Sequence, residues 1–75
     1  MISNKIIQGR FSFWETHGTP GKQYGNVIGK DGKQYFVHQS RLLDGVEPHI
    51  RDECTIYGFL ETKTGRKATL VVLNR

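Results

Sequence analysis

Lys33–Ser40 reads K-Q-Y-F-V-H-Q-S and has the alternation of a β-strand. Because successive side chains of a strand point to opposite faces, Tyr35 and Val37 share one face. These two residues form an apolar pair that we expect to line the core. Phe36 and His38 then lie on the other face, which meets solvent. An aromatic ring and an imidazole in that position need an explanation.

The residues before this strand, Q-Y-G-N-V-I-G-K at 23–30, form another β-like run that ends at Asp31-Gly32. Asp-Gly between two such runs is a strong hairpin signal, because tight turns need residues that adopt positive φ. A two-residue loop conflicts with the face assignment, since residues opposite each other share a face. We therefore expect a connection of odd length or a bulge, which brings Tyr24 and Phe36 to the same side.

Further runs have the composition of strands at residues 5–14, 53–61 and 66–73, and S-R-L-L-D-G at 40–45 predicts a single helical turn. Short strands in so small a chain must protect their edges, and closing into a barrel does so. We predict one all-β domain over residues 1–75. Its expected form is a small five-stranded antiparallel OB-fold barrel with a short helical turn after the third strand.

The net charge of +4 is unevenly distributed: +4 in residues 1–43, −4 in 44–61 and +4 in 62–75. Basic segments separated by an acidic one can fold into a one-sided positive field, which suits a polyanion such as nucleic acid. No apolar run reaches the length of a signal peptide or a membrane span. The single cysteine, Cys54, has no partner for an internal disulfide. We expect a cytoplasmic protein with no membrane contact.

Aromatic side chains on a basic sheet are suited to single-stranded nucleic acid. Unpaired bases stack on them for about 1–3 kcal/mol each, while Lys and Arg follow the phosphates. On this interpretation Tyr24, Phe36 and His38 form one exposed patch, with Phe13 or Trp14 beside it. A lone exposed aromatic is better explained by a covering loop or a protein contact, but several on one basic face favour nucleic acid.

Several motifs of this sequence resemble those of a known family. Y-G-N-V-I at 24–28, followed by K-Q-Y-F-V-H-Q-S, is similar to the two ribonucleoprotein motifs of the cold shock domain, roughly K-G-F/Y-G-F-I and D-V-F-V-H-F/x-S. Q-G-R-F-S-F-W at 8–14 resembles the family's G-x-V-K-W-F, and G-R-K-A-T-L-V-V at 65–72 resembles its closing G-P-x-A-x-x-V. The resemblance covers nearly the whole chain in the same order.

The resemblance implies stacking positions at Phe13, Tyr24, Phe36 and His38. Trp14 occupies the neighbouring aromatic position, because the family's Trp-Phe order appears here as Phe-Trp. Strict alternation from Phe11 directs Trp14 outward, so we keep both residues and prefer Trp14 as the larger stacking surface. The basic residues expected to contact phosphates are Arg10, Lys22, Arg41, Arg66 and Lys67.

The sequence also departs from the family pattern. Asn26 and Gln39 stand where further aromatic residues are expected, so two stacking platforms are missing. The loop between the first two strands is longer than in the family, and Glu15 replaces a neutral residue. The resemblance therefore carries over the fold better than it carries over the affinity or the base preference.

No catalytic or metal-binding motif is present. His17, His38, His49 and Cys54 lack the CxxC or HxxxH spacing of a metal site. G-T-P-G-K at 18–22 lacks the spacing of a phosphate-binding loop and a following helix. Cys54 is expected to be a small core residue, or an outward-facing one of no consequence, rather than a nucleophile. We predict no enzyme activity, no catalytic residue, no metal and no cofactor.

The predicted function is binding of single-stranded RNA or DNA by base stacking, in an RNA-chaperone or regulatory role. The alternative is a protein–protein interaction module on the same barrel, with the aromatic patch contacting a partner and weak or no nucleic-acid binding. The missing aromatics at Asn26 and Gln39 favour that alternative. The expected assembly state is a monomer or a weak dimer, since an apolar patch can self-associate.

Overall fold

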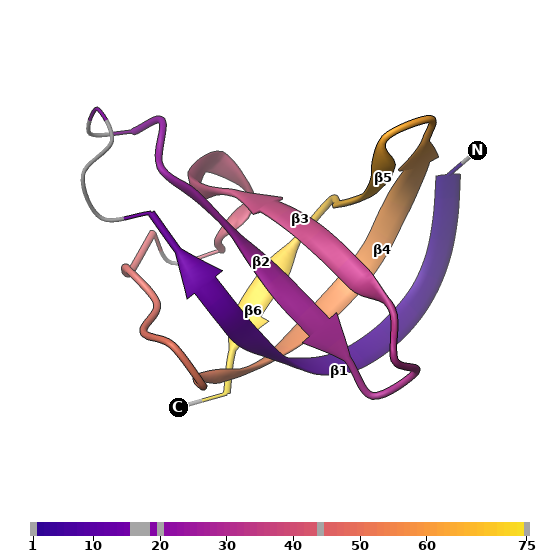
Figure 1. Ribbon diagram of the computed structural model, residues 1–75, viewed down its shortest axis with the longest axis horizontal. Coiled ribbons are helices and arrows are strands. Elements are labelled where there is room, and N and C mark those ends of the chain that lie inside the picture. Colours follow the sequence, from indigo (N-terminus) through magenta and orange to yellow (C-terminus); the bar gives the residue numbers. More distant parts are fainter. Residues whose placement is uncertain (1, 16–18, 20, 44, 75) are drawn as a thin grey trace.

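Six strands and one short 3₁₀ turn make up the computed structural model, which describes residues 2–15, 19, 21–43 and 45–74 (Figure 1). The elements are β1 (Ile2–Trp14), β2 (Tyr24–Gly29), β3 (Gln34–His38), η1 (Gln39–Arg41), β4 (Glu53–Thr62), β5 (Gly65–Ala68) and β6 (Val71–Leu73). In the described part of the chain, no helix is long and apolar enough to cross a membrane.

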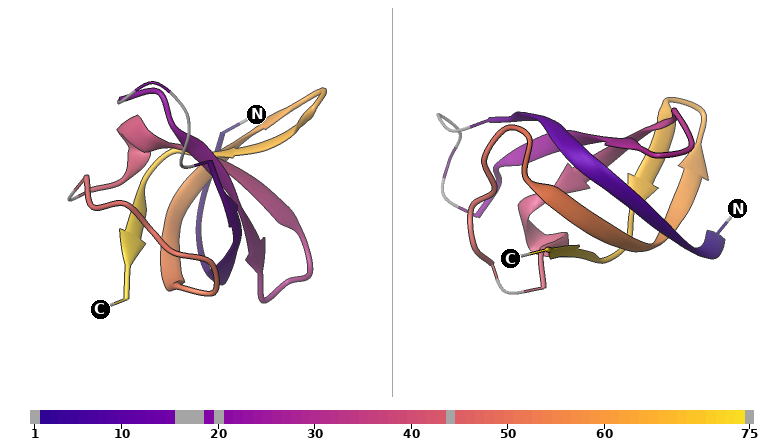
Figure 2. Two further views of the ribbon diagram at one scale, coloured as in Figure 1. Left: turned by 60° about the vertical axis from the view of Figure 1, so that its left-hand side comes forward. Right: turned by 90° about the horizontal axis from the view of Figure 1, so that it is seen from below.

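The long strand β1 closes the sheet into a barrel. Its residues 2–10 pair with β4, and its residues 9–14 pair with β2, so the strand curves around the molecule (Figures 1 and 2). The strand order β1-β2-β3-β5-β4 returns to β1, and β6 adds to β4 as an extra strand. The predicted small all-β barrel with a short helical turn after its third strand is therefore confirmed.

Two details of the strands differ from the sequence-based expectation. The β3–β5 pair runs parallel, whereas the other strand pairs are antiparallel. The run at 66–73 is divided into β5 and β6, because Thr69 and Leu70 between them bond to β4 at Gly58 and Tyr57 outside the regular ladder. The helical turn is also shorter than residues 40–45, since Leu42 already has an extended backbone.

Alternation places the core where the sequence predicts it. Val27, Tyr35 and Val37 are fully buried inside the barrel. The other buried apolar residues are Phe11, Trp14, Leu42, Cys54, Ile56, Phe59, Ala68, Val71 and Leu73. Burial raises the pKa of the Cys54 thiol to about 12, so this cysteine stays neutral and behaves as a small apolar residue.

The β2–β3 hairpin has the odd-length connection that the face assignment requires. Gly29 N–H donates to the Lys33 carbonyl at 2.8 Å, which leaves residues 30, 31 and 32 as the loop. Gly32 supplies the positive φ of 80° that such loops need. As a result Tyr24 lies opposite His38, and the paired residues of β2 and β3 lie on the faces predicted for them.

One hydrogen bond ties the core to this loop. The buried Tyr35 hydroxyl donates to Asp31 Oδ2 at 2.6 Å, and the Lys33 N–H donates to Asp31 Oδ1 at 3.0 Å. Burial and then this bond raise the pKa of Tyr35 to about 12. Although desolvation raises the pKa of Asp31, the two hydrogen bonds and the Lys33 charge hold it below its ordinary value.

Tyr35→Phe is expected to lower the free energy of unfolding at pH 7 by about 1–2 kcal/mol, because it removes a bond to a charged acceptor but keeps the ring. Because the folded pKa of Tyr35 is raised, its contribution is complete below about pH 10 and is lost as the pH rises toward 12. Urea unfolding followed by Trp14 fluorescence at several pH values measures both effects.

The exposed Tyr57 provides the matched control. Tyr57→Phe should change neither the free energy of unfolding nor its dependence on pH. The difference in stability between wild type and Tyr35→Phe should shrink as the pH rises above 10. An unchanged difference across this range would contradict the role given to the Tyr35–Asp31 bond.

Candidate nucleic-acid interface

A row of outward-facing residues crosses five strands of the barrel. Lys67 on β5 lies opposite Leu60 on β4 and beside Phe36 on β3. Phe36 lies opposite Asn26 on β2, which in turn lies opposite Phe13 on β1. Residues that pair across strands share a face, so these five side chains line one continuous surface.

A second row beside the first contains Tyr24 and its partner His38. The Tyr24 ring stacks on Phe36 with centroids 5.6 Å apart and contacts Phe13 with centroids 6.2 Å apart. All three rings nevertheless stay open to solvent: Phe13 is 45% exposed, Tyr24 41% and Phe36 37%. We call Phe13, Tyr24, Phe36 and His38 the aromatic face.

The prediction that Trp14 points outward is wrong. A register shift between Phe11 and Phe13 adds a residue to β1, so alternation changes phase and Phe13 turns outward in its place. Trp14 is only 5% exposed and packs edge-on against Phe11, with ring centroids 5.8 Å apart. Its indole N–H donates to Gln23 Oε1 at 3.3 Å, so its polar atom is also satisfied.

The glycine opposite Trp14 makes this arrangement possible. Gly25 pairs with Trp14, and a Cβ added at Gly25 would lie 2.5 Å from Trp14 Cε3 and closer still to the Phe13 carbonyl oxygen. No side chain fits in that space without a backbone shift. Gly25 therefore leaves room for the indole in the core, and Phe13 is left for the aromatic face.

His38 ends β3 and caps the 3₁₀ turn η1. Its Nδ1 accepts a hydrogen bond from the Ser40 N–H at 3.1 Å and lies 2.8 Å from Ser40 Oγ. With Nδ1 as the acceptor from the Ser40 N–H, the ring hydrogen of this tautomer is on Nε2. The half-buried imidazole is thus held in a fixed orientation beside Phe36.

Gln39 has a structural role in place of the expected aromatic residue. Its Oε1 accepts from the Gln23 N–H at 3.3 Å, and its own N–H donates to the Gln23 carbonyl at 2.8 Å. These bonds hold the start of β2 against η1. In place of an aromatic ring, this position therefore provides hydrogen bonds that hold together the segments next to Tyr24 and His38.

A shallow groove of about 260 Å³ continues the aromatic face toward β4 and β5. Its lining residues are Phe36, His38, Ser40, Arg41, Leu60, Lys67, Ala68 and Thr69. Leu60, Ser40 and Thr69 were not identified from the sequence: the positions of Leu60 and Thr69 depend on how β4 and β5 pair, and that of Ser40 depends on the turn η1. Arg41 and Lys67, two of the residues expected to contact phosphates, bring positive charge to this groove.

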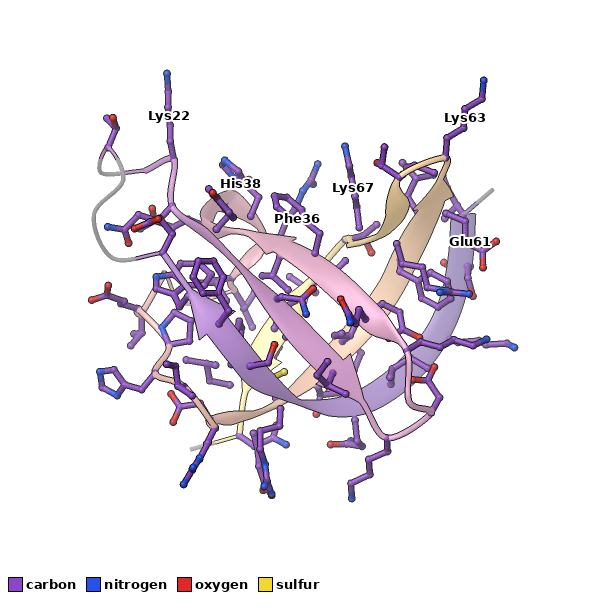
Figure 3. The ribbon with its side chains drawn as sticks, viewed as in Figure 1. Lys22, Phe36, His38, Glu61, Lys63 and Lys67 are labelled. Atoms are coloured by element: carbon purple, nitrogen blue, oxygen red, sulfur yellow. The ribbon has the colours of Figure 1, made fainter. Side chains whose placement is uncertain are left out.

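Lysine side chains project from the same side of the molecule as the aromatic face. In Figure 3, Lys22 lies beyond His38 at one end, and Lys67 and Lys63 lie beyond Phe36 at the other. The β4–β5 hairpin that carries Lys63 extends from the barrel (Figure 2). Lys22, Arg41 and Lys67 form no ion pair with any residue that the structure describes.

Two of the predicted phosphate contacts have other partners. Arg10 lies opposite Ile28 and forms an ion pair with Glu53 at 3.0 Å. Arg66 pairs with Tyr35, whose side chain points into the barrel, although Arg66 also lines a pocket with Phe36 and Lys67. Its Nε is 3.4 Å from Glu61 Oε1, and its guanidinium lies 5.9 Å from the centre of the Phe59 ring.

Among the described residues, no three His, Cys, Asp or Glu side chains gather as metal ligands would. His17, which was considered as a ligand from the sequence, lies outside the described residues. No protein-family model matches this sequence, and no curated protein matches it either. The assignment of a function therefore depends on the geometry of the aromatic face and on the sequence motifs.

Gly25→Ala is expected to lower the free energy of unfolding by about 1–3 kcal/mol, because the added methyl overpacks the contact with Trp14. It should also displace the indole toward solvent and shift the Trp14 emission maximum to longer wavelength. Chemical unfolding and emission spectra measure the two effects on the same samples.

Gly32→Ala is the matched control, because a Cβ at Gly32 meets no atom within 4 Å but is strained by a φ of 80°. It should lower stability without moving the Trp14 emission. An emission shift of equal size in both variants would contradict the specific packing of Trp14 on Gly25.

Proposed function

We propose that the protein binds single-stranded RNA or DNA by stacking unpaired bases on Phe13, Tyr24 and Phe36. The observation that carries this proposal is the mutual contact of three exposed rings on one face of the barrel. Exposing apolar rings to water is unfavourable, whereas stacking a base on such a ring is favourable. Packing among the rings fixes their orientation before a ligand arrives, which reduces the entropy cost of binding.

The positive charges support the same ligand. Lys22 at one end and Lys67 at the other lie in the positions that a backbone crossing the rings would reach (Figure 3). Phosphate contacts of this kind supply affinity without sequence preference and make binding weaken with salt. Stacking is also tolerant of base identity, since every base has a flat face. The expected ligand is therefore unpaired nucleic acid of varied sequence.

The resemblance to the cold shock domain gives independent support from the motifs at residues 24–28 and 33–40. Like members of that family, the protein would hold bases unpaired and so compete with hairpins that RNA forms with itself. This chaperone or regulatory role would need no chemical step.

A protein contact is a second candidate function, and a different surface favours it. Ile6 on β1 and Tyr57 on β4 lie opposite each other and are 62% and 45% exposed. Paired large apolar side chains on an outer sheet face are typical of surfaces that another protein covers. This surface lies outside the aromatic face, so the two functions can be tested separately.

Phe36→Ala is expected to weaken binding of fluorescently labelled oligo-dT or oligo-U about 5- to 150-fold, the equivalent of one lost stacking contact. Tyr57→Ala removes an aromatic residue of similar exposure from another face and should change affinity less than twofold. Fluorescence anisotropy titrations at low salt measure both. Equal effects of the two variants, or no binding by wild type, would reject the stacking proposal.

Lys67→Gln is expected to reduce the slope of log K against log salt by about 0.7, the value for one phosphate contact on a single strand. Lys30→Gln, in the hairpin loop, is the matched control and should leave the slope unchanged. The titrations are the same anisotropy measurements repeated over a series of salt concentrations. Identical slopes for both variants would show that Lys67 does not contact phosphate.

Ile6→Lys tests the second candidate through self-association, the simplest form of protein contact. If copies of this chain meet at the Ile6–Tyr57 surface, sedimentation velocity should show a concentration-dependent dimer for wild type and a monomer for the variant. The same variant should bind oligo-dT as wild type does. A wild type that stays monomeric at high concentration would exclude self-association by this surface.

A further inference from the structure

Asn26 occupies the centre of the outward-facing row, with a phenylalanine opposite it on either side. Phe13 on β1 and Phe36 on β3 both pair with it. Both rings contact Tyr24, two residues before Asn26 on β2, so the three rings surround the amide on three sides. A half-buried polar group therefore interrupts an otherwise apolar surface at its middle.

The hydrogen bonds of Ser12 fix how this amide is oriented. The Ser12 hydroxyl donates its only hydrogen to the Asn26 backbone carbonyl at 3.2 Å. Its oxygen must then act as the acceptor for Asn26 Nδ2, which lies 3.2 Å away. The amide nitrogen is thereby directed toward Ser12, the residue at the bulge of β1.

The remaining hydrogen-bonding capacity of the amide is unused. Within the described residues, no bond involves Asn26 Oδ1, and only one contact uses the two Nδ2 hydrogens. One acceptor and one donor are thus available side by side, at a position held by the sheet. An oriented amide between stacking rings has the chemistry of a base-edge contact.

We propose that Asn26 hydrogen-bonds the Watson–Crick edge of the base seated at the centre of the aromatic face, with Ser12 as its positioning residue. This inference rests on the proposed function and deepens it. Every base has a donor next to an acceptor on that edge, so one amide can pair with any of the four. In a duplex the same edge is occupied by the partner base. Asn26 therefore selects for an unpaired base, with little preference for its identity.

The test removes hydrogen bonding from one base at a time while keeping its shape. Each thymine of a short oligo-dT is replaced in turn by difluorotoluene, a nonpolar ring of the same shape. At one position the replacement should weaken binding to wild type about 2- to 12-fold, the range for a single lost hydrogen bond. Asn26→Ala should bind the original and the replaced oligonucleotides equally at that position.

Two further variants complete the experiment. Gln34→Ala removes an exposed amide from the neighbouring strand and should keep the wild-type position dependence. Ser12→Ala keeps the Asn26 amide but no longer fixes its orientation. This variant should therefore lose part of the difference in affinity between thymine and difluorotoluene, while stacking on Phe36 is unchanged. Thermal unfolding of each variant confirms that the barrel is intact.

Asn26→Asp provides a second readout that does not depend on lost affinity. A carboxylate offers two acceptors, which match the adjacent N1–H and N2–H₂ donors of guanine. Replacing the sensitive thymine by guanine should therefore improve relative affinity for Asn26→Asp but not for wild type. An unchanged guanine-to-thymine ratio would argue against contact between residue 26 and the base edge.

The outcomes separate this inference from the proposed function. If Phe36→Ala weakens binding but no position distinguishes wild type from Asn26→Ala, stacking stands and the Asn26 contact is rejected. If oligo-dT does not bind at low salt, or Phe36→Ala has no effect, both are rejected.

Discussion

The packing of Trp14 on Gly25 is the contact on which the rest of the surface depends. Because the indole lies in the core over a residue without a side chain, β1 must gain a residue at Ser12 to turn it inward. The same bulge turns Phe13 outward. It also sets the Ser12 hydroxyl against Asn26. Core packing, the aromatic face and the orientation of its central amide are therefore consequences of one irregularity in one strand.

Alternation and turn chemistry predicted the regular parts of the structure. Val27, Tyr35 and Val37 are buried as the period-2 pattern indicates, and the conflict at Asp31-Gly32 correctly required an odd-length loop. Trp14 was misplaced because a period-2 argument has no means of locating a bulge. The partners of Arg10 and Arg66 could not be predicted from the sequence, because they depend on which strands pair. Glu53, for example, is 43 residues from Arg10.

The proposed interface combines three kinds of interaction that differ in range and selectivity: lysine charges, the rings of the aromatic face and the Asn26 amide. Lysine charges act over several ångströms and attract any polyanion. In the proposed function, the rings act at contact and accept any base. The Asn26 amide would act only at hydrogen-bond distance, and it would require a free base edge. A ligand that satisfies all three is a flexible, unpaired strand, while a duplex satisfies only the first.

The first half of β1 carries a different consequence. Residues 2–7 pair with β4 but not with β2, so one edge of this segment has no strand beside it in the described part of the chain. Open edges recruit other chains and begin aggregation. The ladder that this segment forms with β4 is broken between Ser3 and Ile6, and the Lys5 N–H donates to Ser3 Oγ at 3.3 Å. An irregular strand that bears a lysine is a poorer template for another chain than a regular open edge.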